Sequence, residues 1–161
     1  TMEYMNINFV EMINQTTGEF TEKFEKRNLQ IVLNVPEKPV MVRTDGRRMW
    51  RVIENIYNNA AKYALEGTRV YANLIEKEHT VEFSLKNISE QPLNISADEL
   101  TERFIRGDVS RSTEGSGLGL SIAKNLTELQ GGKFELYLDG DLFKVTIVFP
   151  KAVVGQSVTK P

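Results

Sequence analysis

Two amides and a lysine recur at helical spacing within the stretch from Arg51 to Tyr63, and their chemistry suits a polyphosphate. Asn55, Asn59 and Lys62 follow one another at intervals of four and three residues, so a helix would place them on one face. An amide oxygen can join the oxygen shell of Mg²⁺, and a lysine can neutralise phosphate. Alone, the pattern is equally compatible with a surface helix whose polar face is rich in asparagine.

A second stretch, Gly115 to Leu120, places three glycines directly before a predicted helix. Free backbone N–H groups at a helix N-terminus, together with missing Cβ atoms, favour an approaching phosphate. The segment lacks the Gly-Lys-Ser/Thr of a P-loop, and its third glycine comes too early for the dinucleotide fingerprint. A flexible linker is the alternative. Against it stands the helical pattern that follows at once, formed by Leu118, Ile122, Leu126 and Leu129 before Gly131-Gly132.

Hydrophobic patterning predicts the elements that would hold these stretches in place. Residues 2–28 predict an amphipathic helix, weakened at Gly18, with one apolar side formed by Phe9, Met12, Ile13, Phe20 and Phe24. Asp45 is the expected N-cap of the helix that carries the amides, and Ser96 that of a short helix over 97–104. Strands are predicted over 29–35, 40–43, 70–76, 81–87, 134–138 and 143–149. Without regular alternation of strand and helix, this order indicates an α+β domain with helices on one face of a mixed sheet.

Composition narrows the classes of function. The chain has 161 residues and is 40% hydrophobic, which suits one globular domain with a proper core. Its 20 basic and 22 acidic residues, net charge −2, give no electrostatic case for nucleic acid or an anionic membrane. The absence of cysteine excludes disulfides and cysteine-based metal sites or nucleophiles. No run of about 18 apolar residues is present, which predicts a soluble chain that does not contact the membrane.

In combination the two motifs resemble a known family. Asn-x-x-x-Asn-Ala-x-Lys-Tyr over 55–63 and Gly-x-Gly-Leu-Gly-Leu over 115–120 are similar to the ATP-binding catalytic domain of bacterial sensor histidine kinases, in the GHKL superfamily. Residues 102–108 resemble that family's phenylalanine-containing segment at the start of the ATP lid. The resemblance covers roughly residues 9–150. It implies the two-layer Bergerat fold, with ATP held between the helices and the lid.

The resemblance implies roles for the helix residues. Asn59 would bind Mg²⁺, Lys62 would contact phosphate, and Tyr63 would line the adenine or ribose side. Related ATPases of the gyrase and chaperone type carry a water-activating glutamate at the position of Asn55. Because an amide cannot act as a general base, the site should hydrolyse ATP poorly and suit phosphoryl transfer to a supplied acceptor. Asn55, Asn59 and Lys62 are therefore the predicted catalytic residues.

The resemblance also implies a phosphate-binding lid. Arg106 would reach phosphate, although an exposed lid arginine is an equally good interpretation. The remaining predicted cofactor contacts come from the glycine-rich segment, namely Gly115, Gly117, Leu118, Gly119 and Leu120. The implied cofactors are ATP and Mg²⁺.

One family motif departs from its usual form. Members of the family end the strand that matches 81–87 with Asp-x-Gly-x-Gly, whereas here the register gives Asn87, Ser89 and Gln91. An aspartate would accept a hydrogen bond from the adenine amino group. The Asn87 carbonyl can also accept this bond, but without the assistance of a charge. We therefore expect nucleotide binding with a different turn beside the base.

The phosphate acceptor is missing from this chain. The family's phosphorylated histidine lies on a separate helical dimerisation domain, and His79, the only histidine, sits in a polar turn and does not match its motif. We expect residues 1–28 to be a helical segment continuing from that domain, 29–150 to be the catalytic domain, and 151–161 to be a disordered tail. The implied partners are the dimerisation domain of the full-length protein and a response regulator. The implied location is the cytoplasmic part of a membrane-anchored bacterial sensor.

Two alternatives remain open beside the histidine kinase. A GHKL-type ATPase or anti-sigma-factor serine kinase is disfavoured by Asn55 and by the close lid match. A non-catalytic module that kept the fold but lost nucleotide binding is favoured only by the altered segment from Asn87 to Gln91.

Overall fold

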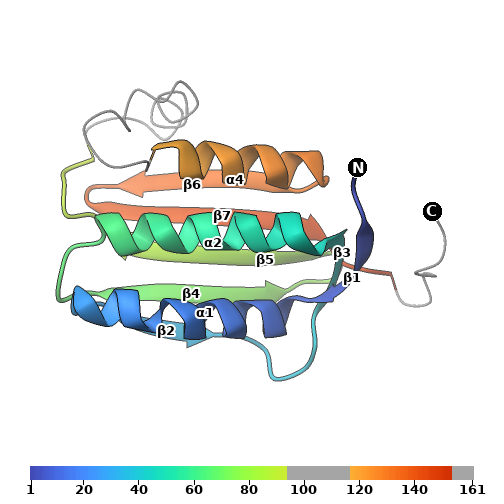
Figure 1. The fold of residues 1–161 in the computed structure, drawn as a ribbon, viewed down its shortest axis with the longest axis horizontal. Coiled ribbons are helices and arrows are strands. Elements are labelled where there is room, and N and C mark those ends of the chain that lie inside the picture. The colour runs from blue at the N-terminus through green and yellow to red at the C-terminus, as the bar shows by residue number, and fades with distance from the viewer. Residues whose placement is uncertain (94–116, 154–161) are drawn as a thin grey trace.

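The computed structural model describes residues 1–93 and 117–153 of the chain, and its order of elements sets out the fold. Three helices and seven strands follow one another in this described part (Figure 1). They are β1 (Tyr4–Asn8), α1 (Phe9–Lys26), β2 (Gln30–Asn34), β3 (Met41–Asp45), α2 (Gly46–Tyr63), β4 (Arg69–Glu76), β5 (Thr80–Ile88), α4 (Gly117–Leu129), β6 (Lys133–Asp139) and β7 (Leu142–Pro150).

A five-stranded mixed sheet forms one layer and the helices form the other. The strand order is β2-β4-β5-β7-β6. β2 and β4 run parallel, whereas every other neighbouring pair is antiparallel. Figure 1 shows α1, α2 and α4 side by side on the same face of this sheet. The predicted α+β two-layer sandwich is therefore confirmed.

The core lies between the two layers, where alternate strand residues meet the apolar sides of the helices. Phe83 of β5 packs against both α1 and α2, because its ring centroid lies 6.3 Å from that of Phe9 and 6.2 Å from that of Tyr57. Tyr57 also stacks on Phe24 of α1 at 6.3 Å. Burial raises the pKa of Tyr57 to about 12, because desolvation disfavours the phenolate even though Thr17 shares a hydrogen bond with it.

The chain start differs from the predicted helix over 2–28. Residues Tyr4–Asn8 form a strand that pairs antiparallel with β3, and the helix begins only at Phe9. Asn8 stops the helix from extending further back, since its side chain accepts a hydrogen bond from the N–H of Glu11 as the N-cap. The predicted apolar side holds, with Phe9, Ile13, Phe20 and Phe24 buried. Gly18 does not interrupt the helix.

The remaining predicted elements lie close to their expected positions. Asp45 caps α2 by accepting a hydrogen bond from the N–H of Arg48 at 3.1 Å. His79 lies in the β4–β5 turn with its side chain 86% exposed, as expected for a solvated turn residue. Lys151 and Ala152 donate backbone hydrogen bonds to His79 and Met41, so regular pairing continues past residue 150. The helix predicted over 97–104 and most of the predicted tail lie outside the described residues.

Candidate functional site

Helix α2 packs against α1 on one side and places Asn55 beside α4. Its buried positions are broader than the predicted stripe, since Tyr57 and Ala61 are buried in addition to Met49, Val52, Ile53, Ile56 and Ala60. Tyr57 faces α1, where its hydroxyl lies 2.7 Å from that of Thr17. Arg27, the C-cap residue of α1, donates a hydrogen bond to the carbonyl of Ala61. The α1 side of the helix is thus held by structural contacts.

The two predicted site amides of α2 carry polar atoms that the described residues leave unpaired. Nδ2 of Asn55 and Oδ1 of Asn59 are both buried, and neither has a hydrogen-bond partner within the described ranges. Asn59 as a whole is only 7% exposed. Because a buried polar group without a partner costs roughly 1–3 kcal/mol, contacts among the described residues do not account for these amides. One atom is an available donor and the other an available oxygen ligand.

The glycine-rich start of α4 lies directly against Asn55. A Cβ atom added to Gly119 would meet Oδ1 of Asn55 at 3.6 Å, and α4 begins at Gly117. The first turn of a helix, with its free N–H groups and the positive end of its dipole, therefore lies beside Asn55. The structure thus brings together Asn55 and Gly119, which are 64 positions apart in the chain.

Not every predicted contact in this segment is a side-chain contact. Leu120 is 2% exposed and belongs to the core, so only its backbone is available to a ligand. Gly117 and Leu118 form the first turn of α4. Arg106 and Gly115 lie outside the described residues and stay predictions.

Lys62 and Tyr63 close the C-terminal end of α2. Lys62 is exposed and Tyr63 is half-buried. The carbonyl of Tyr63 accepts a hydrogen bond from the N–H of Glu90 at 2.9 Å, and the N–H of Leu65 donates to Ile88. The end of α2 is therefore joined to the segment that follows β5.

That segment is the one that departs from the usual family motif. Asn87 is 4% exposed and alternates with Phe83 and Leu85, which places it on the helix-covered face of the sheet. Ser89 is also buried, its N–H donates to the carbonyl of Asp141, and its hydroxyl accepts from the N–H of Gln91 at 3.2 Å. The sequence analysis treated Ser89 only as a replaced glycine. The spacing Ser-x-Gln before Pro92 was the available signal for this serine-capped turn.

The side chains of the site suit a magnesium ion that takes most of its oxygen ligands from substrate phosphates and water. Within residues 1–93 and 117–153, no group of three or more His, Asp or Glu side chains could hold a metal by itself. A single amide oxygen such as Oδ1 of Asn59 is the kind of protein ligand that Mg²⁺ accepts when substrate phosphates and water complete its octahedron. The residues present therefore fit Mg²⁺ bound together with a polyphosphate.

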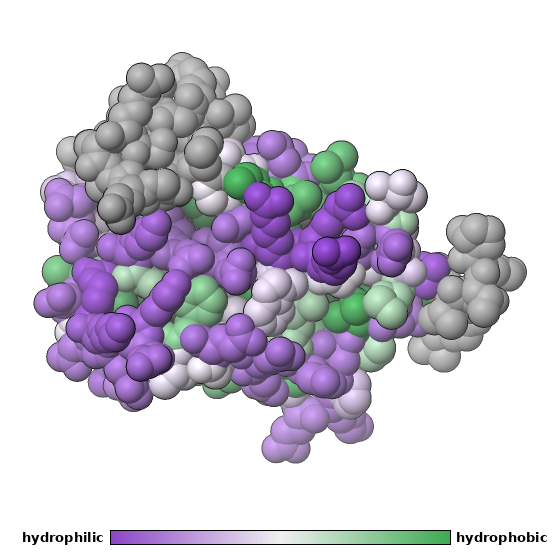
Figure 2. Space-filling view, viewed as in Figure 1, coloured by the Kyte–Doolittle hydropathy of each residue, from purple (hydrophilic) through white to green (hydrophobic). Residues whose placement is uncertain are grey.

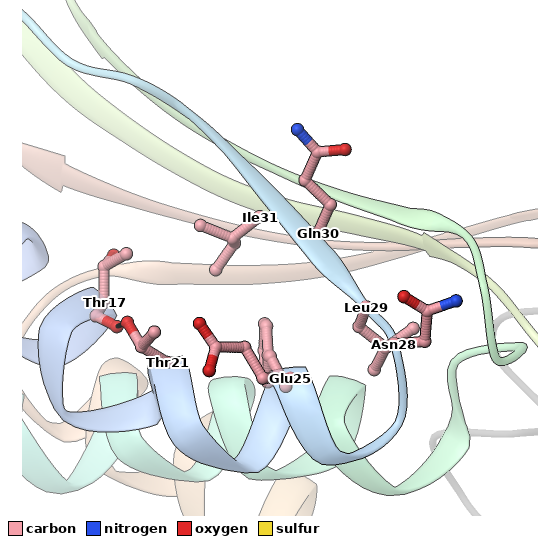
Figure 3. Close-up of a pocket in the computed structure, with 8 residues that line it drawn as sticks. Thr17, Thr21, Glu25, Asn28, Leu29, Gln30 and Ile31 are labelled. Carbon is pink, nitrogen blue, oxygen red and sulfur yellow. Dashed lines mark hydrogen bonds between the residues drawn. The ribbon is translucent and has the colours of Figure 1, made fainter.

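A separate hollow of about 380 Å³ lies between α1 and β2 and does not belong to this site (Figure 3). Thr17 and Thr21 of α1 line it together with Gln30 and Ile31 of β2. None of the predicted site residues contributes to it. In Figure 2, the helix-bearing face around it is mainly hydrophilic, with smaller apolar patches between the polar side chains.

Comparison with known proteins gives the family. The model of the family HATPase_c, the histidine kinase-, DNA gyrase B- and HSP90-like ATPases, matches residues 44–153. The chain belongs to this family. Within it, the similarity to the sensor proteins and kinase domains described next marks it as an ATP-binding catalytic domain of the sensor histidine kinase type, as the sequence analysis predicted.

Two curated relatives and one solved structure illustrate the similarity. Sensor protein KdpD of Clostridium acetobutylicum is 33% identical over 148 residues, which cover 86% of this chain and 16% of that protein. Sensor protein VanSC of Enterococcus gallinarum is 30% identical over 142 residues, covering 87% of this chain and 39% of that protein. The nucleotide-free catalytic domain of histidine kinase ThkA superposes with a TM-score of 0.81 at 26% identity, covering 93% of this chain and 97% of that domain.

The chain therefore spans well under half of the length of the curated relatives it matches. None of the helices in the described part of the chain has the length and apolar character needed to cross a lipid bilayer.

Proposed function

We propose that this domain binds Mg²⁺-ATP between α2 and α4 and donates the γ-phosphoryl group to a histidine on a separate dimerisation domain. The observation that carries the proposal is the unpaired, buried Oδ1 of Asn59 on the same helix face as Asn55, against which the glycine-rich start of α4 lies. Phosphoryl transfer needs positioning and charge neutralisation more than covalent chemistry from the protein. An amide, a lysine and a helix N-terminus supply these.

Each residue has a distinct task in this proposal. Asn59 holds Mg²⁺, which when bound neutralises charge on the β- and γ-phosphates. Lys62 adds a positive charge beside the phosphates, and the N–H groups at the start of α4 orient them, assisted by Gly115 and Arg106 of the lid. Tyr63 and Asn87 lie at the base end, where the Asn87 carbonyl accepts from the adenine amino group.

Asn55 favours transfer over hydrolysis. Its amide has no basic form near neutral pH, so it cannot take a proton from an attacking water. Its buried N–H group is instead available to donate a hydrogen bond toward the nucleotide or a bound water. A steady-state phosphate-release assay separates the two functions. Slow release without an acceptor supports the kinase, whereas rapid release would indicate a GHKL-type ATPase.

Because His79, the only histidine of this chain, does not match the acceptor motif, the proposed function requires partners. We propose a helical dimerisation domain of the same longer protein, reached through residues 1–28, and a response regulator downstream. Relatives named as sensor proteins favour this arrangement, and ThkA has been solved in complex with response regulator protein TrrA. We also propose that the longer protein is membrane-anchored, with this domain in the cytoplasm.

The experiment uses a neighbouring asparagine as its control. Asn59→Ala should lower phosphoryl transfer to an added acceptor domain by about 100-fold or more, because it removes the ligand of a metal with strict geometry. Asn58→Ala, at the position just before Asn59 in α2, should leave transfer unchanged, since Asn58 accepts a hydrogen bond from Lys23 on the α1 side. Equal transfer by both variants would contradict the assignment. Acid-stable label on the isolated chain would indicate a Ser/Thr kinase instead.

A further inference from the structure

The face of the sheet that the helices do not cover carries a row of two lysines between two tyrosines. In the strand register, Tyr71 of β4 lies opposite Lys86 of β5, Lys86 lies opposite Lys144 of β7, and Lys144 lies opposite Tyr137 of β6. All four alternate with core residues, so they share the outer face. This Tyr–Lys–Lys–Tyr row crosses four adjacent strands.

The two lysines are a like-charged pair directly opposite each other, with the carboxylates of Glu135 and Asp139 only at diagonal positions on β6. Directly opposed side chains in an antiparallel pair have Cβ atoms about 4.5–5.5 Å apart, and like charges at such positions destabilise the sheet. No Asp or Glu oxygen within residues 1–93 and 117–153 forms an ion pair with either ammonium. Lys86 instead places its Nζ 5.3 Å from the centre of the Tyr71 ring. The fold therefore keeps an arrangement that would be more stable with an acid at one of the two positions.

A shallow hollow accompanies the row. It has a volume of about 390 Å³, and the lysines, Tyr137, Glu135 and Thr146 are among the side chains that line it. Tyr137 is 54% exposed and its hydroxyl donates to Asp139 at 3.4 Å, so its ring borders the hollow. This face is opposite the one that bears α2 and α4, and is therefore separate from the nucleotide site (Figure 1).

We propose that the Tyr–Lys–Lys–Tyr row is a docking site for a protein segment that presents two adjacent carboxylates. Two lysines at directly opposed positions match a compact dianion, and the tyrosines add apolar ring area at either end of the row. A long polyanion such as nucleic acid fits less well, because Glu82, Glu135 and Asp139 lie on the same face and the chain has a net charge of −2. Charge complementarity therefore favours an acidic protein segment.

The test is a titration of the isotope-labelled chain followed by amide NMR. The probe is a short synthetic peptide with a central Asp-Glu pair, compared with the same peptide carrying Asn-Gln. Shifts confined to the central part of β4, β5, β6 and β7 are expected with the acidic peptide only. Lys86→Gln and Lys144→Gln should each weaken binding about tenfold, as the loss of one charge-assisted contact implies. Lys133→Gln is the matched control, since it removes the same charge from the exposed start of β6 on the same face.

A second variant distinguishes a binding role from a structural one. Lys86→Glu should abolish peptide binding and at the same time raise the melting temperature, because it places a carboxylate opposite Lys144 at a position with no acid beside it on β4 or β7. A lower melting temperature would contradict the proposed repulsion. Peptide binding that survives both glutamine variants would overturn the site. Equal competition by inorganic phosphate or a single-stranded oligothymidine would overturn the choice of an acidic protein segment.

Discussion

The two ends of α2 bury polar groups in opposite ways. At its N-terminal end, Asp45 accepts hydrogen bonds from the N–H groups of Glu3 and Arg48 and from the Arg48 guanidinium, while its own N–H donates to Gln130. Further along the helix, Asn55 and Asn59 each bury a polar atom that no described residue pairs. The first arrangement is complete within the fold, whereas the second has no partner among the described residues and is the one that we propose a ligand completes.

Lack of a partner alone does not mark a ligand site. The hydroxyls of Thr44 and Thr127 are also buried and unpaired within the described part of the chain. The amides differ because Asn55 lies beside the glycine-rich start of α4, where a ligand can reach its polar group. What identifies the site is therefore an unpaired polar atom together with a backbone that leaves room for phosphate.

Removal of the Asp45 carboxylate should have the largest effect on stability. Asp45→Ala removes the N-cap of α2, leaves the Glu3 N–H unpaired and takes the carboxylate partner from the Arg48 guanidinium, so the free energy of unfolding should fall by about 2–4 kcal/mol. Urea unfolding at neutral pH measures this. The extra stability gained on adding Mg²⁺-ATP should persist, since the proposed nucleotide site lies further along the helix, at Asn55 and Asn59. If Asp45→Ala lost the stabilisation by Mg²⁺-ATP, the distinction between the two ends of α2 would be contradicted.

The charge of Asp45 should also make stability depend on pH. Its hydrogen bonds, led by that from Glu3, lower its pKa from 3.8 to about 2 although burial acts in the opposite direction. A group with a lowered folded pKa stabilises the fold above its unfolded pKa, and this stability, roughly 2 kcal/mol, disappears as the pH falls from about 4 to 2. Asp45→Asn keeps the N-cap but not the charge. The difference in unfolding free energy between wild type and this variant should therefore shrink as the pH falls through that window. A difference that stays constant would contradict a stabilising role for the Asp45 charge.

Asn87→Asp tests the proposed contact between Asn87 and the adenine base. A charge-assisted bond to the adenine amino group should tighten ATP binding by about 1 kcal/mol, or several-fold. Because Asn87 is 4% exposed, the buried carboxylate should also lower stability without nucleotide. Asn87→Ala should weaken ATP binding by a similar amount. Calorimetric titration with ATP and GTP measures the affinities of both variants. The aspartate variant should discriminate more strongly against GTP. Unchanged binding by the alanine variant would mean that another group reads the base.

The smallest expected effect on stability comes from Gly119. The added methyl group of Gly119→Ala would lie at ordinary contact distance from Asn55, so the fold should accept it. The loss of a helical glycine should raise stability by about 0.5–1 kcal/mol. The same methyl group occupies space that phosphate needs, so ATP affinity should fall. A variant that gains stability and keeps its affinity would place the phosphates elsewhere.

The sequence predicted α2 well because its helix, cap and amides are all local features. Periodicity placed the apolar side, and Asp45 matched the expected cap chemistry. The resemblance to a family implied that the two motifs share one site, but the contact between Asn55 and Gly119 was not predicted, since spacing along the chain does not say how two helices pack. The departure at Ser89 was visible, but its hydrogen bond to Asp141 joins two loops that only the folded sheet brings together.

The features that the sequence did not predict depend on long-range pairing. Residues Tyr4–Asn8 are a strand because β3 pairs with them, while their own apolar pattern merges with that of the following helix. Gln130 completes the Asp45 network from 85 residues away. The Tyr–Lys–Lys–Tyr row likewise exists only in the strand register.

The most direct test of the account measures unfolding of wild type, Asp45→Ala and Asn59→Ala, each with and without Mg²⁺-ATP. Without ligand, Asn59→Ala should be as stable as wild type within about 1 kcal/mol, because the lost oxygen makes no hydrogen bond to the described residues. With ligand, it should lose most of the stabilisation that Mg²⁺-ATP gives wild type, whereas Asp45→Ala should retain it. A strongly destabilised Asn59→Ala that keeps the full stabilisation by Mg²⁺-ATP would contradict the account.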